Sequence, residues 1–87
     1  MKEANMLDTI GKWIKFNELS EKYFEVKDEY EINVLTKRVR NSKTGHILNW
    51  IDTGNSTVGK VISLNKDNGK NSNYHYTQVS RLCRLYQ

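Results

Sequence analysis

The side chains with the clearest capacity for chemistry in this 87-residue chain are basic, and they concentrate in its second half. Residues 37–87 hold nine Lys and Arg against two acids, a balance of +7. Residues 1–36 hold five Lys against eight acids, a balance of −3. A basic half of this kind favours a polyanionic partner such as nucleic acid. The alternative interpretation is a solvated face that keeps a small protein in solution.

Lys and Arg contact phosphates, and Arg also reads guanine edges in the major groove of DNA. The candidate nucleic-acid contacts are the basic residues of the predicted strands, turns and final helix: Lys37, Arg38, Arg40, Lys43, Lys60, Lys70, Arg81 and Arg84. Acidic side chains of the first half could instead mimic phosphates and bind a protein. The candidate protein-binding residues are therefore Glu18, Glu21, Glu25 and Glu29.

The sequence contains no recognisable catalytic constellation. His46 and His75 do not form a metal-ligand motif, and the single cysteine, Cys83, excludes both an intramolecular disulfide and a cysteine-based zinc site. Cys83 is predicted to be a buried core thiol, because it lies on the apolar stripe of a predicted helix with no His in register. We expect no enzyme activity, no metal site and no cofactor.

The stretch from Tyr30 to Trp50 is predicted to organise the fold as two short strands around a turn. Apolar residues alternate with polar ones from Tyr30 to Val34, the period of a half-buried strand. The turn is predicted at Asn41–Gly45, where Gly supplies a positive φ angle. Arg38 and Arg40 have the same parity and should therefore share one face of the strand.

Two more strands and a helix are predicted in the second half. The strands are Val58–Asn65 and Asn73–Gln78, joined by a type I′ turn at Lys66–Gly69 because Asn-Gly favours that turn. Tyr30 and Tyr76 are predicted to have a packing role, in the core or across strands. A C-terminal helix that packs on the sheet is predicted from a stripe of apolar residues at Val79, Leu82, Cys83 and Tyr86.

The N-terminal region allows more than one structure. Apolar residues at helical spacing between residues 4 and 15 predict a short amphipathic helix, but Gly11 disfavours it, and an extended arm is the alternative. The segment Asn17–Glu21 is predicted to begin another short helix. The segment Tyr23–Val26 is compatible with a strand as well.

These patterns predict an α+β fold: a small antiparallel β-sheet of three to four strands, a short C-terminal helix and helical or arm-like N-terminal residues. Residues 1–22 form the N-terminal segment and residues 23–87 the sheet-and-helix module of one compact domain. No apolar run reaches membrane-spanning length, and the N-terminus lacks a secretory leader. We therefore expect a cytoplasmic protein without a membrane partner.

Four short motifs follow one another from about Tyr30 to Tyr86. The first runs from Tyr30 to Leu48 and contains Val39-Arg40 and Thr44-Gly45; the others are Gly59–Leu64, Asn68–Lys70 and Val79–Cys83. In order and spacing this series resembles the modular DNA-recognition domain, of the NUMOD type, of HNH homing endonucleases from phages and mobile introns. The sequence departs from the family pattern at three positions: Thr36-Lys37 replace a Gly and add one residue, Lys60 replaces an aromatic residue, and Ser80 replaces a His.

The resemblance implies a non-catalytic nucleic-acid-binding module of phage or mobile-element type, with double-stranded DNA as the expected partner and the host cytoplasm as its location. In the family such a module directs a nuclease, whose HNH motif this sequence does not contain. The rival hypothesis is a phage-encoded inhibitor, anti-CRISPR-like in role, that binds a host nucleoprotein enzyme. The acidic first third of the chain motivates this rival.

Overall fold

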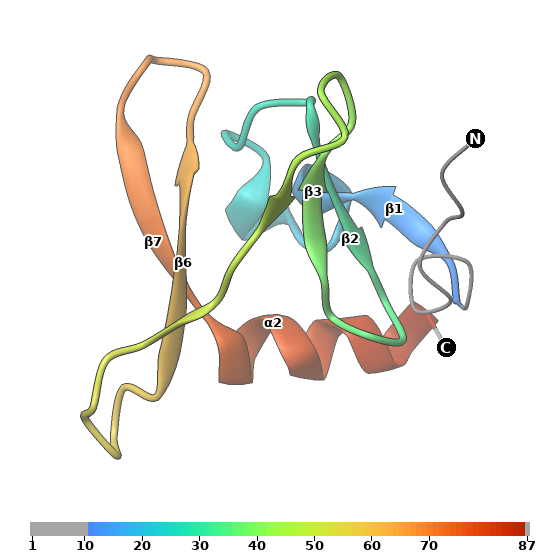
Figure 1. Ribbon diagram of the computed structural model, residues 1–87. Helices are drawn as coiled ribbons and strands as arrows, with labels where there is room; N and C mark the ends of the chain where they lie inside the picture. The colour runs from blue at the N-terminus through green and yellow to red at the C-terminus, as the bar shows by residue number, and fades with distance from the viewer. Residues whose placement is uncertain (1–10, 87) are drawn as a thin grey trace.

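The computed structural model describes residues 11–86 as two small antiparallel sheets and a C-terminal helix, an α+β fold as the sequence predicts (Figure 1). Each sheet is built from strands that follow one another in the chain, so neighbours in sequence are neighbours in space. The first sheet has the order β1 (Trp13–Lys15), β2 (Tyr30–Asn33), β3 (Val39–Asn41) and β4 (Ile47–Leu48). The second has the order β5 (Ile51–Asp52), β6 (Lys60–Asn65) and β7 (Asn71–His75).

Helical structure lies at the two ends of the described chain. Two 3-10 turns, η1 (Phe16–Glu18) and η2 (Glu21–Tyr23), follow β1, and the helix α2 (Tyr76–Cys83) continues into the 3-10 turn η3 (Arg84–Tyr86). Figure 1 shows α2 starting at the lower end of β7 and running below the first sheet. The hydroxyl of Tyr86 donates to the carbonyl of Glu18 at 2.9 Å and so ties the C-terminal turn to η1.

The hydrophobic core lies between the first sheet, the β6–β7 hairpin and α2. Ile32, Val39, Ile62, Leu64 and Val79 are each at most 1% exposed. The strand register explains the inward face of the first sheet, because Ile32 is paired with Ile14 on one side and with Val39 on the other. Residues two apart on a strand point to the same face, so Tyr30 and Ile32 both enter the core, while Asn33 at the end of β2 is buried as well.

The stretch Tyr30–Trp50 contains three strands, not the predicted two. The predicted turn at Asn41–Gly45 is present, with Gly45 at φ 76°. A second turn, at Asn33–Lys37, separates β2 from β3. Local composition does not indicate this turn, because the turn contains no Gly. Its Val34 is also buried, as a strand residue would be.

Two details of the β6–β7 hairpin also differ from the prediction. Only Gly69 has a positive φ in the Lys66–Gly69 turn, so the predicted type I′ turn, which needs two such residues, is wrong. The amide of Gly69 donates to the carbonyl of Lys66, and the returning strand ends at His75. Tyr76 and Gln78 therefore belong to α2 rather than to a strand. The predicted helical stripe is confirmed at Val79 and Cys83, which are fully buried, and at Leu82, which packs against the core, but Tyr86 is 37% exposed and lies in η3.

The N-terminal segment takes the extended alternative where the structure describes it. Residues 13–15 form β1 and pair with β2, so the predicted helix is wrong over these residues; its part in residues 4–10 lies outside the described chain. The expected short helix near Asn17–Glu21 is present as η1 and η2, with Ser20 capping η2. The segment Tyr23–Val26 is not a strand, and Val26 makes only an isolated bridge to Lys66.

Candidate nucleic-acid interface

One turn geometry occurs three times in the described chain, at Asn33–Lys37, Asn41–Gly45 and Asn55–Gly59. In each turn the side-chain oxygen of the Asn accepts from the backbone N–H groups two and three residues later. The backbone carbonyl of the Asn accepts from the backbone N–H of the fifth residue of the turn. This fifth residue has a positive φ in all three turns. Asn side chains favour such turns because they replace a backbone acceptor locally.

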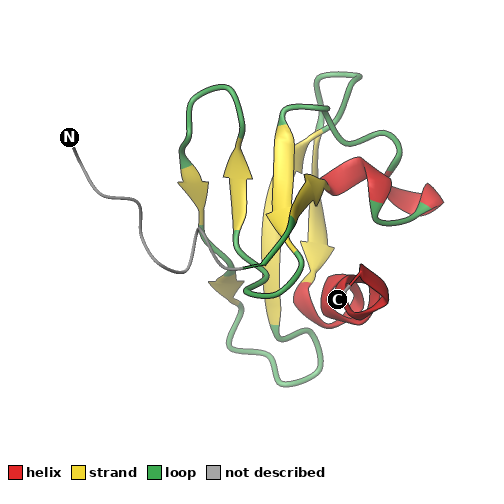
Figure 2. Cartoon of the chain, turned by 90° about the vertical axis from the view of Figure 1, so that its right-hand side faces the viewer, coloured by secondary structure: helices red, strands yellow, loops and turns green. Residues whose placement is uncertain are grey.

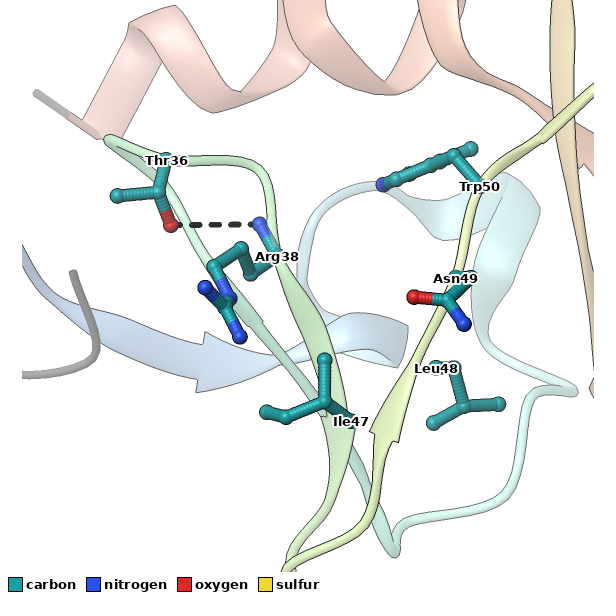
Figure 3. Close-up of a pocket in the computed structure, with 6 residues that line it drawn as sticks. All are labelled: Thr36, Arg38, Ile47, Leu48, Asn49 and Trp50. Carbon is teal, nitrogen blue, oxygen red and sulfur yellow. Dashed lines mark hydrogen bonds between the residues drawn. The ribbon is translucent and has the colours of Figure 1, made fainter. Parts of the chain in front are cut away.

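The turn Asn33–Lys37 places Thr36 and Arg38 at the mouth of an open cleft of about 550 Å³. The hydroxyl of Thr36 accepts from the backbone N–H of Arg38 at 3.3 Å, which fixes the two residues relative to one another. Thr36 and Arg38 form one wall of the cleft, and β4 with the link between β4 and β5 forms the other. Figure 3 shows Arg38 and Asn49 on opposite sides of this cleft. Its complete lining is Thr36, Arg38, Ile47, Leu48, Asn49 and Trp50.

Trp50 connects the cleft to α2. Its indole N–H donates to the carbonyl of Lys37 at 2.8 Å, so the turn holds the ring in place. Its ring meets Tyr76 edge to face, with the centroids 5.0 Å apart. The ammonium of Lys60 lies 5.7 Å from the centroid of Tyr76, within cation–π range. The predicted packing role of Tyr76 is thus confirmed, on a helix and not on a strand.

Arg84 is exposed at the start of η3, about two helical turns after Tyr76, which begins α2. Burial raises the pKa of the Cys83 thiol on α2, and the charge of Lys37 opposes that rise in part. We call Lys37, Arg38, Lys60 and Arg84 the basic band: Lys37 and Arg38 adjoin Trp50, Lys60 lies over Tyr76, and Arg84 follows the helix that Tyr76 begins.

Arg40 has a structural role in the first sheet. Its Nε donates to Glu31 Oε1 at 2.9 Å, across the register that pairs β3 with β2. Its guanidinium also lies 3.9 Å from the ring centroid of Trp13 on β1. Arg38 and Arg40 have the parity expected of a shared face, because the residue between them, Val39, is fully buried. Only Arg38 lines the cleft.

The other basic residues that the sequence predicts as nucleic-acid contacts lie outside the basic band. Arg81 lines a second open cleft of about 400 Å³ together with His75 and Gln78. Lys43 lines a third, of about 440 Å³, whose other charged residues have both signs: Lys15, Lys27, Asp28, Glu29 and Asp67. In that third cleft the pKa of Asp28 is lowered, first by a hydrogen bond from Asn17 and then by Lys15. Lys70 is exposed beside the turn of the β6–β7 hairpin.

We call residues 16–25, which contain η1 and η2, the 3-10 segment, and most of the acids predicted to bind a protein lie on it. Glu18, Glu21 and Glu25 are exposed there, and Phe24 among them is 70% exposed. Glu29 differs, since its carboxylate accepts from the Asn41 side chain at 2.7 Å and so supports a turn. Figure 2 shows the 3-10 segment at the right and the β3–β4 hairpin at the left, on opposite sides of the molecule.

The nucleophilic and metal-ligating side chains of residues 11–86 do not gather into one site. Cys83 is fully buried as predicted, and burial raises the pKa of its thiol to about 11, which disfavours a nucleophilic thiolate. Within residues 11–86, no three His, Cys, Asp or Glu side chains gather as a metal site. None of the helices over the same residues combines the length and the apolar character needed to span a membrane.

Sequence reasoning selected Arg38 but missed Thr36, Asn49 and Trp50. The sequence does contain a signal for the turn that carries Thr36. The pattern Asn-x-x-Thr occurs at residues 33–36 and again at residues 41–44, where a turn is predicted. No family model, curated protein or solved structure gives a significant match to this chain.

Proposed function

We propose that this protein is a non-catalytic nucleic-acid-binding module that contacts its ligand, expected to be double-stranded DNA, through the basic band. The observation that carries the proposal is the placement of Arg38 in an open cleft beside a Trp50–Tyr76 pair, with Lys60 next to it. Cations supply phosphate contacts, and the aromatic and Arg side chains supply contacts to bases.

The resemblance to NUMOD-type modules supports the same proposal. The family has a Gly after its first strand, and this chain has Thr36-Lys37 there. Lys37 nevertheless has φ 64°, the left-handed backbone that a Gly would adopt at that place. A role beside a phage or mobile-element nuclease follows from this resemblance, with the module acting in the host cytoplasm.

The experiment is a fluorescence-anisotropy titration of labelled duplex DNA at several salt concentrations. Binding should weaken steeply as salt rises, because cations that neutralise phosphates release counterions. The double variant K60A/R84A should lower affinity about tenfold or more and reduce the salt slope by about two, since each lost phosphate contact reduces it by about one. Thermal melts check that both proteins remain folded.

The matched control is K43A/K70A, which removes two exposed lysines that lie outside the basic band. This variant should bind nearly as well as the parent protein. Equal losses in both double variants would show that binding depends on overall charge and not on the band. Absence of binding at low salt would overturn the proposal.

A second candidate function is the inhibitor of a host nucleoprotein enzyme. The exposed ring of Phe24 among the acids of the 3-10 segment favours it, because exposed aromatic residues are frequent in protein interfaces. Under this hypothesis E18Q/E21Q/E25Q abolishes activity while K60A/R84A does not. Glu29 is left unchanged in the variant because it holds the Asn41 side chain. DNA binding that survives the three Gln changes supports the first proposal.

A further inference from the structure

We infer that the cleft between Arg38 and Asn49 receives one unstacked nucleobase of the bound nucleic acid, with guanine preferred. The inference rests on the proposed function and specifies its ligand: double-stranded DNA that presents an unpaired guanine in a loop or a bulge. It gives separate tasks to the cleft, which would hold the base, and to the rest of the basic band, which would hold the flanking phosphates.

The composition of the cleft matches that of a site for a small aromatic ligand. Its volume of about 550 Å³ falls within the range of ligand pockets, roughly 300–1,000 Å³. Half-buried Ile47, Leu48 and Trp50 form an apolar surface. Thr36, Arg38 and Asn49 add hydroxyl, guanidinium and amide groups at its edge (Figure 3).

These polar groups can distinguish among bases. A guanidinium donates two parallel hydrogen bonds to O6 and N7 of guanine, a pair of acceptors that cytosine and thymine do not present. Asn49, on the opposite side and exposed, has both donor and acceptor atoms in its amide. Thr36 already accepts from the Arg38 backbone, which leaves its hydroxyl proton to donate to a base.

The cleft is organised before any ligand arrives. Asn33 holds the backbone N–H of Thr36 at 3.1 Å, and the carbonyl of Lys37 holds the indole N–H of Trp50. Because that N–H is occupied, Trp50 would serve as an apolar and stacking surface, not as a donor. Pre-organised groups lose less entropy on binding, which favours a defined pose for the base.

A base that enters a concave cleft must leave the stack of its own duplex. Unstacking and unpairing oppose binding by a few kcal/mol, and this penalty is smallest where the base is already unpaired. A hairpin loop, a bulge or a single strand should therefore bind better than a fully paired duplex. Lys60, which lies over Tyr76 beside Trp50, is placed to contact the phosphates next to the inserted base.

The experiment uses Trp50 as the reporter. The chain has two tryptophans, so W13F leaves Trp50 alone, and its fluorescence is followed during titration. Three DNA probes of equal charge are compared: a hairpin with one guanine in its loop, the same hairpin with cytosine there, and a fully paired duplex. The guanine hairpin should bind about tenfold more tightly than the other two and quench Trp50, since a good bidentate contact discriminates by about this factor or more.

Two variants and a control test the residues. R38K keeps the charge but loses the planar fork, so binding should persist while the guanine preference disappears. N49A should reduce the preference, whereas N73A, which truncates an exposed Asn on β7, should leave it unchanged. Circular dichroism confirms the fold of each variant.

The outcomes separate this inference from the proposed function. Binding of all three probes with equal affinity, or a guanine preference unchanged in R38K, overturns the base-binding inference while DNA binding stands. Failure of every probe to bind at low salt overturns the proposed function and this inference with it. A preference for the hairpins over the duplex without discrimination between guanine and cytosine overturns the assignment to guanine.

Discussion

The turns Asn33–Lys37 and Asn41–Gly45 have the same hydrogen bonds in different surroundings. In both, the Asn oxygen accepts from two backbone N–H groups, and the Thr hydroxyl accepts from the N–H two residues later. Asn33 is fully buried, while the second turn is exposed over residues 42–46. One local geometry therefore serves as a core element at one site and as a solvent-exposed connection at another.

The two turns should differ most in how much their asparagines contribute to the free energy of unfolding. Asn33→Ala should lower the free energy of unfolding by about 2–4 kcal/mol, because the N–H groups of Leu35 and Thr36 lose their acceptor where water does not readily replace it. Asn41→Ala should lower it by about 1 kcal/mol or less, because water solvates the exposed turn. Urea denaturation of both variants measures the difference, and equal losses would contradict the role assigned to burial.

The two turns also differ in how well the sequence predicts them. The turn at Asn41–Gly45 is visible in composition, since Ser42, Lys43 and Gly45 are poor strand residues. The turn at Asn33–Lys37 contains Val34 and Leu35, which favour strands, and its positive φ falls on Lys37. Burial of Val34 is a tertiary effect, so local patterns alone assigned it to a strand.

The candidate site was less predictable than the fold. Charge and spacing selected Arg38, but they selected Arg40 equally, and only the strand register shows that Arg40 is paired with Glu31. The cleft depends on the link between the two sheets, where Asn49 and Trp50 follow β4. Which residues meet across such a link is set by packing, which short-range sequence patterns do not record.

The buried turn also differs from the exposed one in lying near Cys83 on α2. Burial raises the pKa of this thiol to about 11, and the charge of Lys37 opposes that shift in part. In the unfolded chain the thiol ionises near its ordinary pKa of about 9. The unfolded state therefore loses this proton first, and stability should fall as pH rises from about 9 to about 11, by up to about 2–3 kcal/mol.

The check is urea denaturation at pH 8 to 11 for the parent protein and for Cys83→Ala. Burial also raises the pKa of Tyr23 and Tyr74, which gives a slope of the same sign in both proteins, and Cys83 adds to the shift at Tyr23. The difference between the two proteins therefore reports the thiol together with its effect on Tyr23, and this difference should shrink as pH rises. A difference that is independent of pH would show that the thiol ionises alike in both states.

The smallest expected effect concerns the residue that ends each turn. Lys37 has φ 64° and Gly45 has φ 76°, and a non-Gly residue in this left-handed region is destabilised by roughly 1–2 kcal/mol. Lys37→Gly removes that strain but adds freedom to the unfolded chain, so it should stabilise the protein by about 0.5–1 kcal/mol. Gly45→Lys should destabilise it by about 1 kcal/mol, because the space around its Cβ position is open and only φ opposes the change.

If Lys37 belongs to the basic band, Lys37→Gly should bind DNA more weakly although it is more stable. Lys37→Asn is the matched control, because Asn tolerates the left-handed region better than Lys and removes the same charge. Denaturation and anisotropy measured on both variants separate strain from charge. Greater stability with unchanged affinity would exclude Lys37 from the interface. Lower stability in Lys37→Gly would show that the hydrogen bond from the Lys37 ammonium to the Leu35 carbonyl outweighs the backbone strain, so the two turns would differ in side-chain bonding as well as in burial.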